Sequence, residues 1–122
     1  MIERGYGKVI NISSIVGQVA IINQLAYGSA KGGVNEMTRI MALEWAKSGI
    51  RVNAIAPTYF ETDMVKQIRD DPERLKFINE RTPMGRWGKL HELEGILIFM
   101  AAPASDFITG QIICIDGGWT AC

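Results

Sequence analysis

The segment that decides the fold is Lys8-Val9-Ile10-Asn11-Ile12-Ser13-Ser14. Its apolar residues are all β-branched, and it is bounded by Gly5 and Gly7 on one side and by Gly17 on the other. Short β-branched runs between turn-forming residues are typical of buried strands. We therefore expect a buried strand over residues 8–14, and the other elements follow from it along the chain.

The next element is expected to be a long helix over residues 24–48. This segment lacks proline, repeats apolar residues at helical spacing and is followed by Gly49, a residue type that commonly ends helices. We expect the helix to be largely buried through one apolar stripe. That stripe consists of Ala30, Val34, Met37, Met41 and Trp45, widened by Ile40 and Leu43.

The rest of the chain alternates between strand and helix patterns. Asp71 followed by Pro72 is a typical start of a helix. Such alternation is typical of a parallel sheet covered by helices on both faces. The fold class is therefore α/β, in one domain over residues 1–122, with three strands that all have the composition of central strands. The further elements predicted are a strand over residues 50–56, helices over residues 61–69, 72–81 and 90–102, and a strand over residues 111–115.

Composition excludes several classes of protein. The chain has 122 residues, and its 13 Lys and Arg interleave with 13 Asp and Glu, so no nucleic-acid partner is expected. A hydrophobic content of 48% excludes a disordered chain, and no apolar run is long enough to span a bilayer. The N-terminus has no signal-peptide core, and Cys114 and Cys122 form no metal-type or redox-type pair. We expect a cytoplasmic protein with no membrane partner and no metal site.

The chemically loaded segment is Tyr27-Gly28-Ser29-Ala30-Lys31. On a helix, residues four apart share a face, so the phenol of Tyr27 and the ammonium of Lys31 are expected to be neighbours. A nearby cation favours the phenolate form of a tyrosine, which can then exchange a proton with an alcohol or a carbonyl oxygen. This pair alone is weak, because a packed aromatic ring and a solvated lysine would give the same pattern.

Ser14 strengthens the pattern. It is expected at the carboxyl end of the strand that leads into this helix, which is where open α/β sheets bind ligands. Its hydroxyl can bond the same substrate oxygen as Tyr27. A hydrolase with Ser14 as nucleophile is disfavoured, because no GxSxG turn surrounds it and no spacing connects it to His91, the single histidine.

These segments resemble the short-chain dehydrogenase/reductase family, and the resemblance runs from Gly5 to Gly118, essentially the whole chain. In that family the serine orients the substrate oxygen, the tyrosine is the acid/base, and the lysine assists the tyrosine and binds the nicotinamide ribose. The resemblance therefore implies that Ser14, Tyr27 and Lys31 are catalytic. The segments that carry it are residues 7–14, 27–31, 51–57, 108–111 and 116–118.

The resemblance also implies NAD or NADP as cofactor, bound in part by Tyr27 and Lys31. Backbone contacts to the nicotinamide are expected after Pro57, from Thr58 to Phe60, and Thr62 is expected to hold the carboxamide. The family usually has glycine where Thr58 stands. If this position needs a positive φ, we expect a strained backbone or a shifted loop there.

Within the family, residues 81–83 and 85–88 resemble gluconate 5-dehydrogenase and related sugar-acid or polyol oxidoreductases, and 3-oxoacyl-(acyl carrier protein) reductases are the alternative. Arg86 and Trp87 are interpreted equally well as substrate contacts or as a loop anchored by one aromatic residue. His91 is expected at the surface, and Asp116 before two glycines is expected to form a turn.

The Gly-rich turn that binds a dinucleotide pyrophosphate is absent from the sequence. By comparison with the family, we expect the C-terminal half of a Rossmann-type doubly wound sheet, with the N-terminal half and one active-site asparagine missing. The strand over residues 8–14 would then have an open edge. We expect the chain alone to be marginally stable, oligomeric or dependent on a complementing half, with little activity.

Two hypotheses about function remain open. In the first, the chain is the catalytic half of an NAD(P)-dependent oxidoreductase that acts on a small alcohol or ketone and assembles as a homo-oligomer. In the second, it is a non-catalytic remnant that retains the helix and strand surfaces used for assembly.

Overall fold

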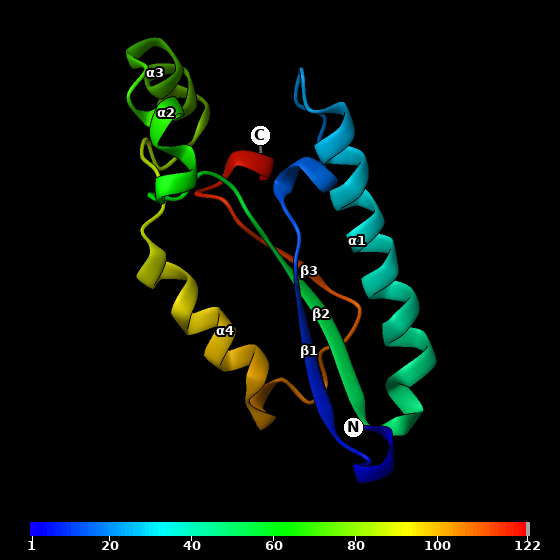
Figure 1. The fold of residues 1–122 in the computed structure, drawn as a ribbon. Coiled ribbons are helices and arrows are strands. Elements are labelled where there is room, and N and C mark those ends of the chain that lie inside the picture. Colours follow the sequence, from blue (N-terminus) through cyan, green and yellow to red (C-terminus); the bar gives the residue numbers. More distant parts are fainter. Residues whose placement is uncertain (122) are drawn as a thin grey trace.

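The computed structural model describes residues 1–121 as a three-stranded parallel sheet between helices (Figure 1). The strands are β1 (Gly7–Ile12), β2 (Ile50–Pro57) and β3 (Ile112–Ile115), in the order β1-β2-β3. Helix α1 (Leu25–Trp45) covers one face of the sheet and α4 (Glu94–Ala101) covers the other. The expected α/β architecture, with three parallel strands and flanking helices, is confirmed.

Two shorter helices, α2 (Lys66–Arg69) and α3 (Pro72–Arg81), lie beyond the carboxyl end of β2 (Figure 1). The cap predicted for α3 is present, since Asp71 accepts hydrogen bonds from the amides of Glu73 and Arg74. Gly5 ends the first turn with a φ of 63°. Short 3-10 segments complete the chain at Ile2–Arg4, Ile15–Gly17, Ala46–Ser48, Asp63–Val65, Leu90–Leu93, Pro103–Ser105 and Trp119–Ala121.

Strand β2 is the interior strand and is nearly all buried, as predicted. Strand β1 differs from the prediction, because only Gly7 within it is buried and Ile12 is 53% exposed. Within the described residues β1 pairs on one side alone, Gly7 with Ile50 through Ile12 with Ile55. The expected open edge is therefore present, and within the described residues β1 and β3 are edge strands although their composition is that of central strands.

The predicted burial of α1 is confirmed only in part. The helix turns Asn35, Thr38 and Ala42 to the sheet, while the predicted core residues Met37, Ile40 and Leu43 are exposed, with exposed fractions from 45% to 81%. The sheet accepts this face because β2 presents the small, fully buried Ala54 and Ala56 and β1 presents polar partners. The other predicted core residues Val34, Met41 and Trp45 are half-buried, and Met41 and Trp45 pack against the cluster around Ala42, so the buried face is rotated from the predicted stripe and overlaps it in part.

Two apolar clusters form the core. Beside α1, Ala42 packs with Ile50 and Val52 at the amino ends of the strands. The second cluster lies at the carboxyl end and joins Ile15, Ile78, Trp87 and Trp119 from segments far apart in the sequence. This second cluster fastens α3 and the C-terminal turn to the segment that follows β1.

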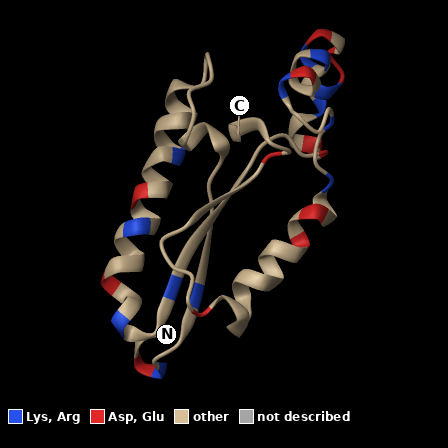
Figure 2. Cartoon of the chain, turned by 180° about the vertical axis from the view of Figure 1, so that it is seen from behind, with Lys and Arg blue, Asp and Glu red and all other residues tan. Residues whose placement is uncertain are grey.

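Positions of Lys and Arg alternate with positions of Asp and Glu along α1 and across the α2–α3 region (Figure 2). Among the described residues, no helix combines the length and apolar character that crossing a bilayer requires. Cys114 is a free thiol, and Cys122 lies outside the described residues.

The loop before β3 is fastened by side chains from the other two strands. Lys8 forms an ion pair with Asp106 at 2.7 Å, and Arg51 donates to the Asp106 carbonyl. Asn53, 2% exposed, donates to the Ile108 carbonyl at 2.9 Å and accepts from the Gln111 amide at 3.0 Å. Asn53 therefore joins β2 to the segment directly before β3 through buried hydrogen bonds.

Replacing Asn53 with leucine should destabilise the chain by roughly 2 to 4 kcal/mol, because the Ile108 carbonyl and the Gln111 amide both lose a buried partner. Urea unfolding followed by circular dichroism measures the change. Gln111→Ala, which alters an exposed side chain, is the control and should stay within about 0.5 kcal/mol of the parent. Equal stability of Asn53→Leu and the parent would contradict this role.

Candidate active site

Ser14 lies directly beyond the carboxyl end of β1 and is 7% exposed. It caps the following 3-10 turn, where its Oγ accepts from the Val16 amide at 3.3 Å. The Oγ is also 3.5 Å from the Pro57 carbonyl, a distance at which a hydrogen bond is weak. The hydroxyl proton can therefore be donated to another oxygen that arrives at this edge.

Tyr27 and Lys31 lie on the first turns of α1 and share a face, as the spacing predicts. Lys31 Nζ lies 5.6 Å from the centre of the Tyr27 ring and donates to the Ile12 carbonyl at 2.8 Å. Tyr27 is 47% exposed, so its phenol is accessible. Because Ile12 is the last residue of β1, this bond places the lysine at the carboxyl end of the strand, next to Ser14.

A buried polar network joins the Ser14 segment to α1. Ser13 Oγ donates to Asn35 Oδ1, and Asn35 Nδ2 donates to the Gly17 carbonyl at 3.0 Å. Two residues earlier on β1, Asn11 donates to Thr38 Oγ at 2.9 Å. Sequence reasoning missed this network, although the polar residues Asn35 and Thr38 at helical spacing were a signal that could have revealed it.

The segment after β2 carries the residues predicted to contact a nicotinamide. The Thr58 amide donates to the Ile115 carbonyl at 3.2 Å, so it already has a partner. Thr58 does not have a positive φ, because Asn23 alone does so among the described residues other than glycine. The strain expected at Thr58 is therefore absent.

Phe60 and Thr62 continue this segment. Phe60 is 7% exposed and forms an isolated parallel bridge with Gly88, which ties the loop after β2 to the loop before α4. Thr62 is half-buried at the start of the Asp63–Val65 turn, and its side chain does not cap that turn.

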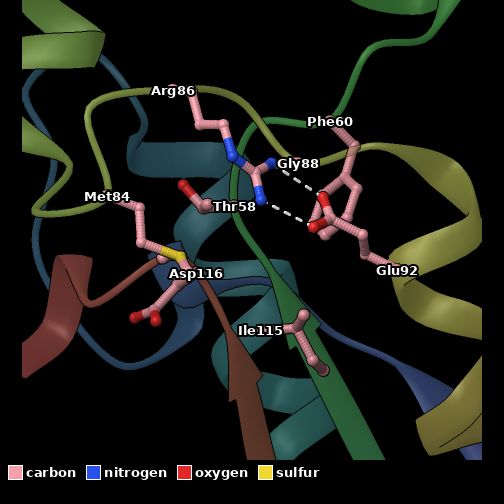
Figure 3. A pocket seen from close by; sticks show the side chains of 9 residues that line it. Thr58, Phe60, Met84, Arg86, Gly88, Glu92, Ile115 and Asp116 are labelled. Carbon is pink, nitrogen blue, oxygen red and sulfur yellow. Dashed lines mark hydrogen bonds and ion pairs between the residues drawn. The ribbon is translucent and has the colours of Figure 1, made fainter.

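A cavity of about 220 Å³ lies between the carboxyl ends of β2 and β3 and the loop that contains Arg86 (Figure 3). Thr58 and Phe60 line it on one side, and Met84, Arg86 and Asp116 line it on another. The Thr58 hydroxyl is buried without a hydrogen-bond partner. Two of the predicted cofactor residues thus lie at one cavity, separate from the residues around Tyr27.

Arg86 is held by Glu92 through two bonds of 2.7 and 2.8 Å, visible in Figure 3. The hydrogen bond from Arg86, with a second from the Lys89 amide, lowers the pKa of Glu92 to about 2, and the same pair raises the pKa of Arg86. Trp87 is 5% exposed and packs 5.3 Å from the Tyr59 ring. Of the two interpretations, these contacts favour the loop anchor.

The two other singled-out residues behave as predicted. His91 is exposed. Asp116 forms a turn in which its carboxylate accepts from the Gly118 amide and from the amide and hydroxyl of Thr120. Burial raises the pKa of Asp116, but these hydrogen bonds outweigh it and leave the pKa below its ordinary value. Within residues 1–121 no group of His, Cys, Asp and Glu has the arrangement of a metal site.

Comparison with known proteins shows the family. A family model described as enoyl-(acyl carrier protein) reductase matches residues 1–120. The chain is 46% identical over 119 residues to 2-dehydro-3-deoxy-D-gluconate 5-dehydrogenase of Bacillus subtilis (strain 168), covering 98% of this chain and 47% of the relative. Gluconate 5-dehydrogenase of Gluconobacter oxydans (strain 621H) is 40% identical over 120 residues, with coverage of 98% and 47%. The chain thus spans about half the length of the curated relatives it matches.

Solved structures agree with these sequence relatives. A gluconate 5-dehydrogenase from Burkholderia cenocepacia J2315, in complex with NADP and tartrate, superimposes with a TM-score of 0.97 at 43% identity. The match covers 99% of this chain and 48% of that one, as expected of part of a Rossmann fold. On the family model, the relatives and the shared fold, the chain belongs to the short-chain dehydrogenase/reductase family of NAD(P)-dependent oxidoreductases.

Proposed function

We propose that residues 1–122 are a partial dehydrogenase domain and supply the proton-transfer half of an oxidoreductase that interconverts a secondary alcohol and a ketone. Tyr27 is the acid/base. In the reductive direction its phenol donates a proton to the carbonyl oxygen, and in the oxidative direction its phenolate accepts the hydroxyl proton. The observation that carries the proposal is the bond from Lys31 Nζ to the Ile12 carbonyl, which holds a cation beside Tyr27.

Ser14 and Lys31 support the proton transfer in different ways. The Ser14 hydroxyl donates to the substrate oxygen and directs it to Tyr27, because its own proton has only the long contact with Pro57. The ammonium of Lys31 places a positive charge 5.6 Å from the centre of the Tyr27 ring, beside the group that gives and takes the proton. Both residues lie at the carboxyl end of β1.

NAD or NADP would supply the hydride when bound. Lys31 and Tyr27 would contact its ribose, and Thr62, whose hydroxyl caps no backbone amide, would bind its carboxamide. Pro57, Thr58 and Phe60 would form the wall beside the nicotinamide. The residues present suit that role, because Ser14 and Pro57 meet at one sheet edge and the Thr58 hydroxyl still lacks a partner.

The substrate class proposed is a sugar acid or a polyol. This rests on relatives named for gluconate, 2-dehydro-3-deoxy-D-gluconate and galactitol. The alternative substrate is a 3-oxoacyl thioester. For either substrate, Arg86 is already paired with Glu92 in this structure. Residues 84–88 therefore offer no unpaired cation to bind a substrate carboxylate.

A second candidate function is assembly without catalysis. Two features of the described chain favour it: the outer face of α1 exposes Met37, Ile40 and Leu43, and β1 is paired with β2 alone, which leaves backbone groups at its other edge free to pair. Cofactor-dependent turnover separates the two functions. The chain is best tested both alone and fused in place of the matching 119 residues of the Bacillus subtilis relative, since it spans 47% of that protein.

In the fusion, Tyr27→Phe should lower kcat/KM for gluconate oxidation about 10²- to 10⁴-fold, because the general acid/base is removed while the ring remains. NADPH fluorescence should show cofactor binding retained. Tyr6→Phe is the matched control, since Tyr6 is 45% exposed against 47% for Tyr27 and lies before β1. Equal activity of both variants would contradict the assigned role, and an inactive parent fusion that binds cofactor would favour the second function.

We propose that the chain self-associates through the outer face of α1. Ile40→Glu combined with Leu43→Glu should shift it toward monomer in sedimentation velocity, because both side chains are exposed apolar groups on that face. Met64→Glu, at a position 92% exposed and outside α1, should leave the distribution unchanged. A monomeric parent chain at all concentrations would overturn self-association.

A further inference from the structure

Asn35 connects α1 to both ends of the segment that carries Ser14. It lies one helical turn after Lys31 and is 2% exposed. Its Oδ1 accepts from Ser13 Oγ, and its Nδ2 donates to the Gly17 carbonyl at 3.0 Å. One carboxamide therefore fastens the residues before and after Ser14 to the helix that carries Tyr27 and Lys31. We refer to this pair of bonds as the Asn35 bridge.

Gly17 allows the turn after Ser14 to approach α1 closely enough for the Asn35 bridge to form. A Cβ atom at this position would lie 2.8 Å from the carbonyl carbon and oxygen of Lys31 and 2.9 Å from Asn35 Nδ2. The turn and the helix backbone are therefore in direct contact. Ser13 Oγ also lies 3.3 Å from the Lys31 carbonyl, so the contact is made at the turn of α1 that holds Lys31.

Two further contacts of the segment around Ser14 do not involve α1. Ile15, 1% exposed, packs in the cluster with Ile78 and Trp87. The Gly17 amide donates back to the Ser14 carbonyl at 3.0 Å within the turn itself. Neither of these two contacts sets the position of Ser14 along α1. The contacts that reach α1 are the Asn35 bridge, the Ser13 contact with the Lys31 carbonyl, the close approach of Val16 to Gly28 and the bond from Lys31 Nζ to the Ile12 carbonyl. Among these, the Asn35 bridge is the one that bonds residues on both sides of Ser14.

We propose that Asn35 is a positioning residue that sets the separation between the Ser14 hydroxyl and the Tyr27 phenol, so that both reach one substrate oxygen. This rests on the proposed function, in which the two groups act together. The strength of a hydrogen bond falls sharply as its distance and angle depart from the preferred values. A small displacement of the Ser14 segment therefore lowers turnover more than it lowers substrate binding.

The test compares Asn35→Leu with Thr38→Val. The leucine has a similar size but neither donates nor accepts, so both bonds of the bridge are lost. Thr38 is a matched control because it is fully buried on the same face of α1 and bonds β1 through Asn11, away from Ser14. Both variants remove buried hydrogen bonds, and only one of them affects the Ser14 segment directly.

The first measurement is amide hydrogen exchange in the chain itself. In Asn35→Leu, the Gly17 and Gln18 amides should exchange about tenfold faster than in Thr38→Val, because the turn they close is released from α1. Equal exchange at these amides in the two variants would overturn the proposed placement of the turn by Asn35.

The second measurement is the kcat-against-KM split in the fusion described above. Asn35→Leu should lower kcat by about tenfold or more and change KM by less than about threefold. Thr38→Val should leave both within about threefold even if its melting temperature falls. A Thr38→Val variant with the same loss of kcat, or an Asn35→Leu variant with the parent kcat, would overturn the proposal.

Asn35→Asp gives a third measurement, a pH profile of kcat per folded molecule, with the folded fraction measured by circular dichroism at each pH. Its ionised carboxylate accepts from Ser13 but cannot donate to the Gly17 carbonyl, whereas the protonated form can do both. The kcat of this variant relative to the parent should therefore rise as the pH is lowered. A ratio that is constant with pH would overturn the need for the bond to Gly17.

These measurements separate this inference from the proposed function. If the parent fusion shows no turnover, the proposed function fails, and amide exchange still decides whether Asn35 places the turn. If the parent turns over and Tyr27→Phe does not, while Asn35→Leu keeps the parent kcat, the proposed function stands and the inference fails.

Discussion

Hydrogen bonds between buried side chains of α1 and β1 are the constraint on which the candidate site depends. Asn35 bonds Ser13, which directly follows the end of β1, and Thr38 bonds Asn11 within β1. A buried polar group without a partner is costly, so these pairs allow little sliding or rotation of the helix. An apolar contact would be less restrictive, because hydrophobic burial has no directional requirement. The relative placement of Ser14, Tyr27 and Lys31 therefore follows from the packing of one helix.

This packing also explains the surfaces of the chain. Because Asn35 and Thr38 turn toward the sheet, Met37, Ile40 and Leu43 lie on the outer side of α1. The interior strand contributes Ala54 and Ala56 at the contact, which brings the helix close enough for the polar pairs to bond. The same arrangement thus orders the candidate site and leaves an apolar face available for assembly.

Local signals in the sequence predicted most of the fold. Helix α3 was predicted within its observed bounds because Asp71 and Pro72 mark its start. The strands were predicted from their composition, and their parallel direction from the alternation of strands and helices. The face of α1 was predicted only in part, because a polar residue at a buried position depends on a partner about 20 to 30 residues away, and the helical period does not contain that information. The composition of residues 8–14 predicted a buried strand, and the open edge of β1 was expected only from the family resemblance, since burial depends on neighbouring strands.

The candidate site shows the same division. Ser14, Tyr27 and Lys31 were predicted from spacing, and the structure places Ser14 and Lys31 at one sheet edge with Tyr27 beside the lysine. The pairing of Arg86 with Glu92 was not predicted, because it depends on how the loop before α4 folds back. The roles of Asn35 and Gly17 were also not predicted, since each is defined by a contact made after the helix docks.

The proposed oxidoreductase role, with Tyr27 as the acid/base, is tested by giving the fusion protein 4-deuterated NADPH and a keto sugar acid. Mass spectrometry then follows deuterium into the product. We expect one deuterium on the carbinol carbon of the product, at a rate that depends on Tyr27. Saturating cofactor binding with no deuterium in the product would contradict it.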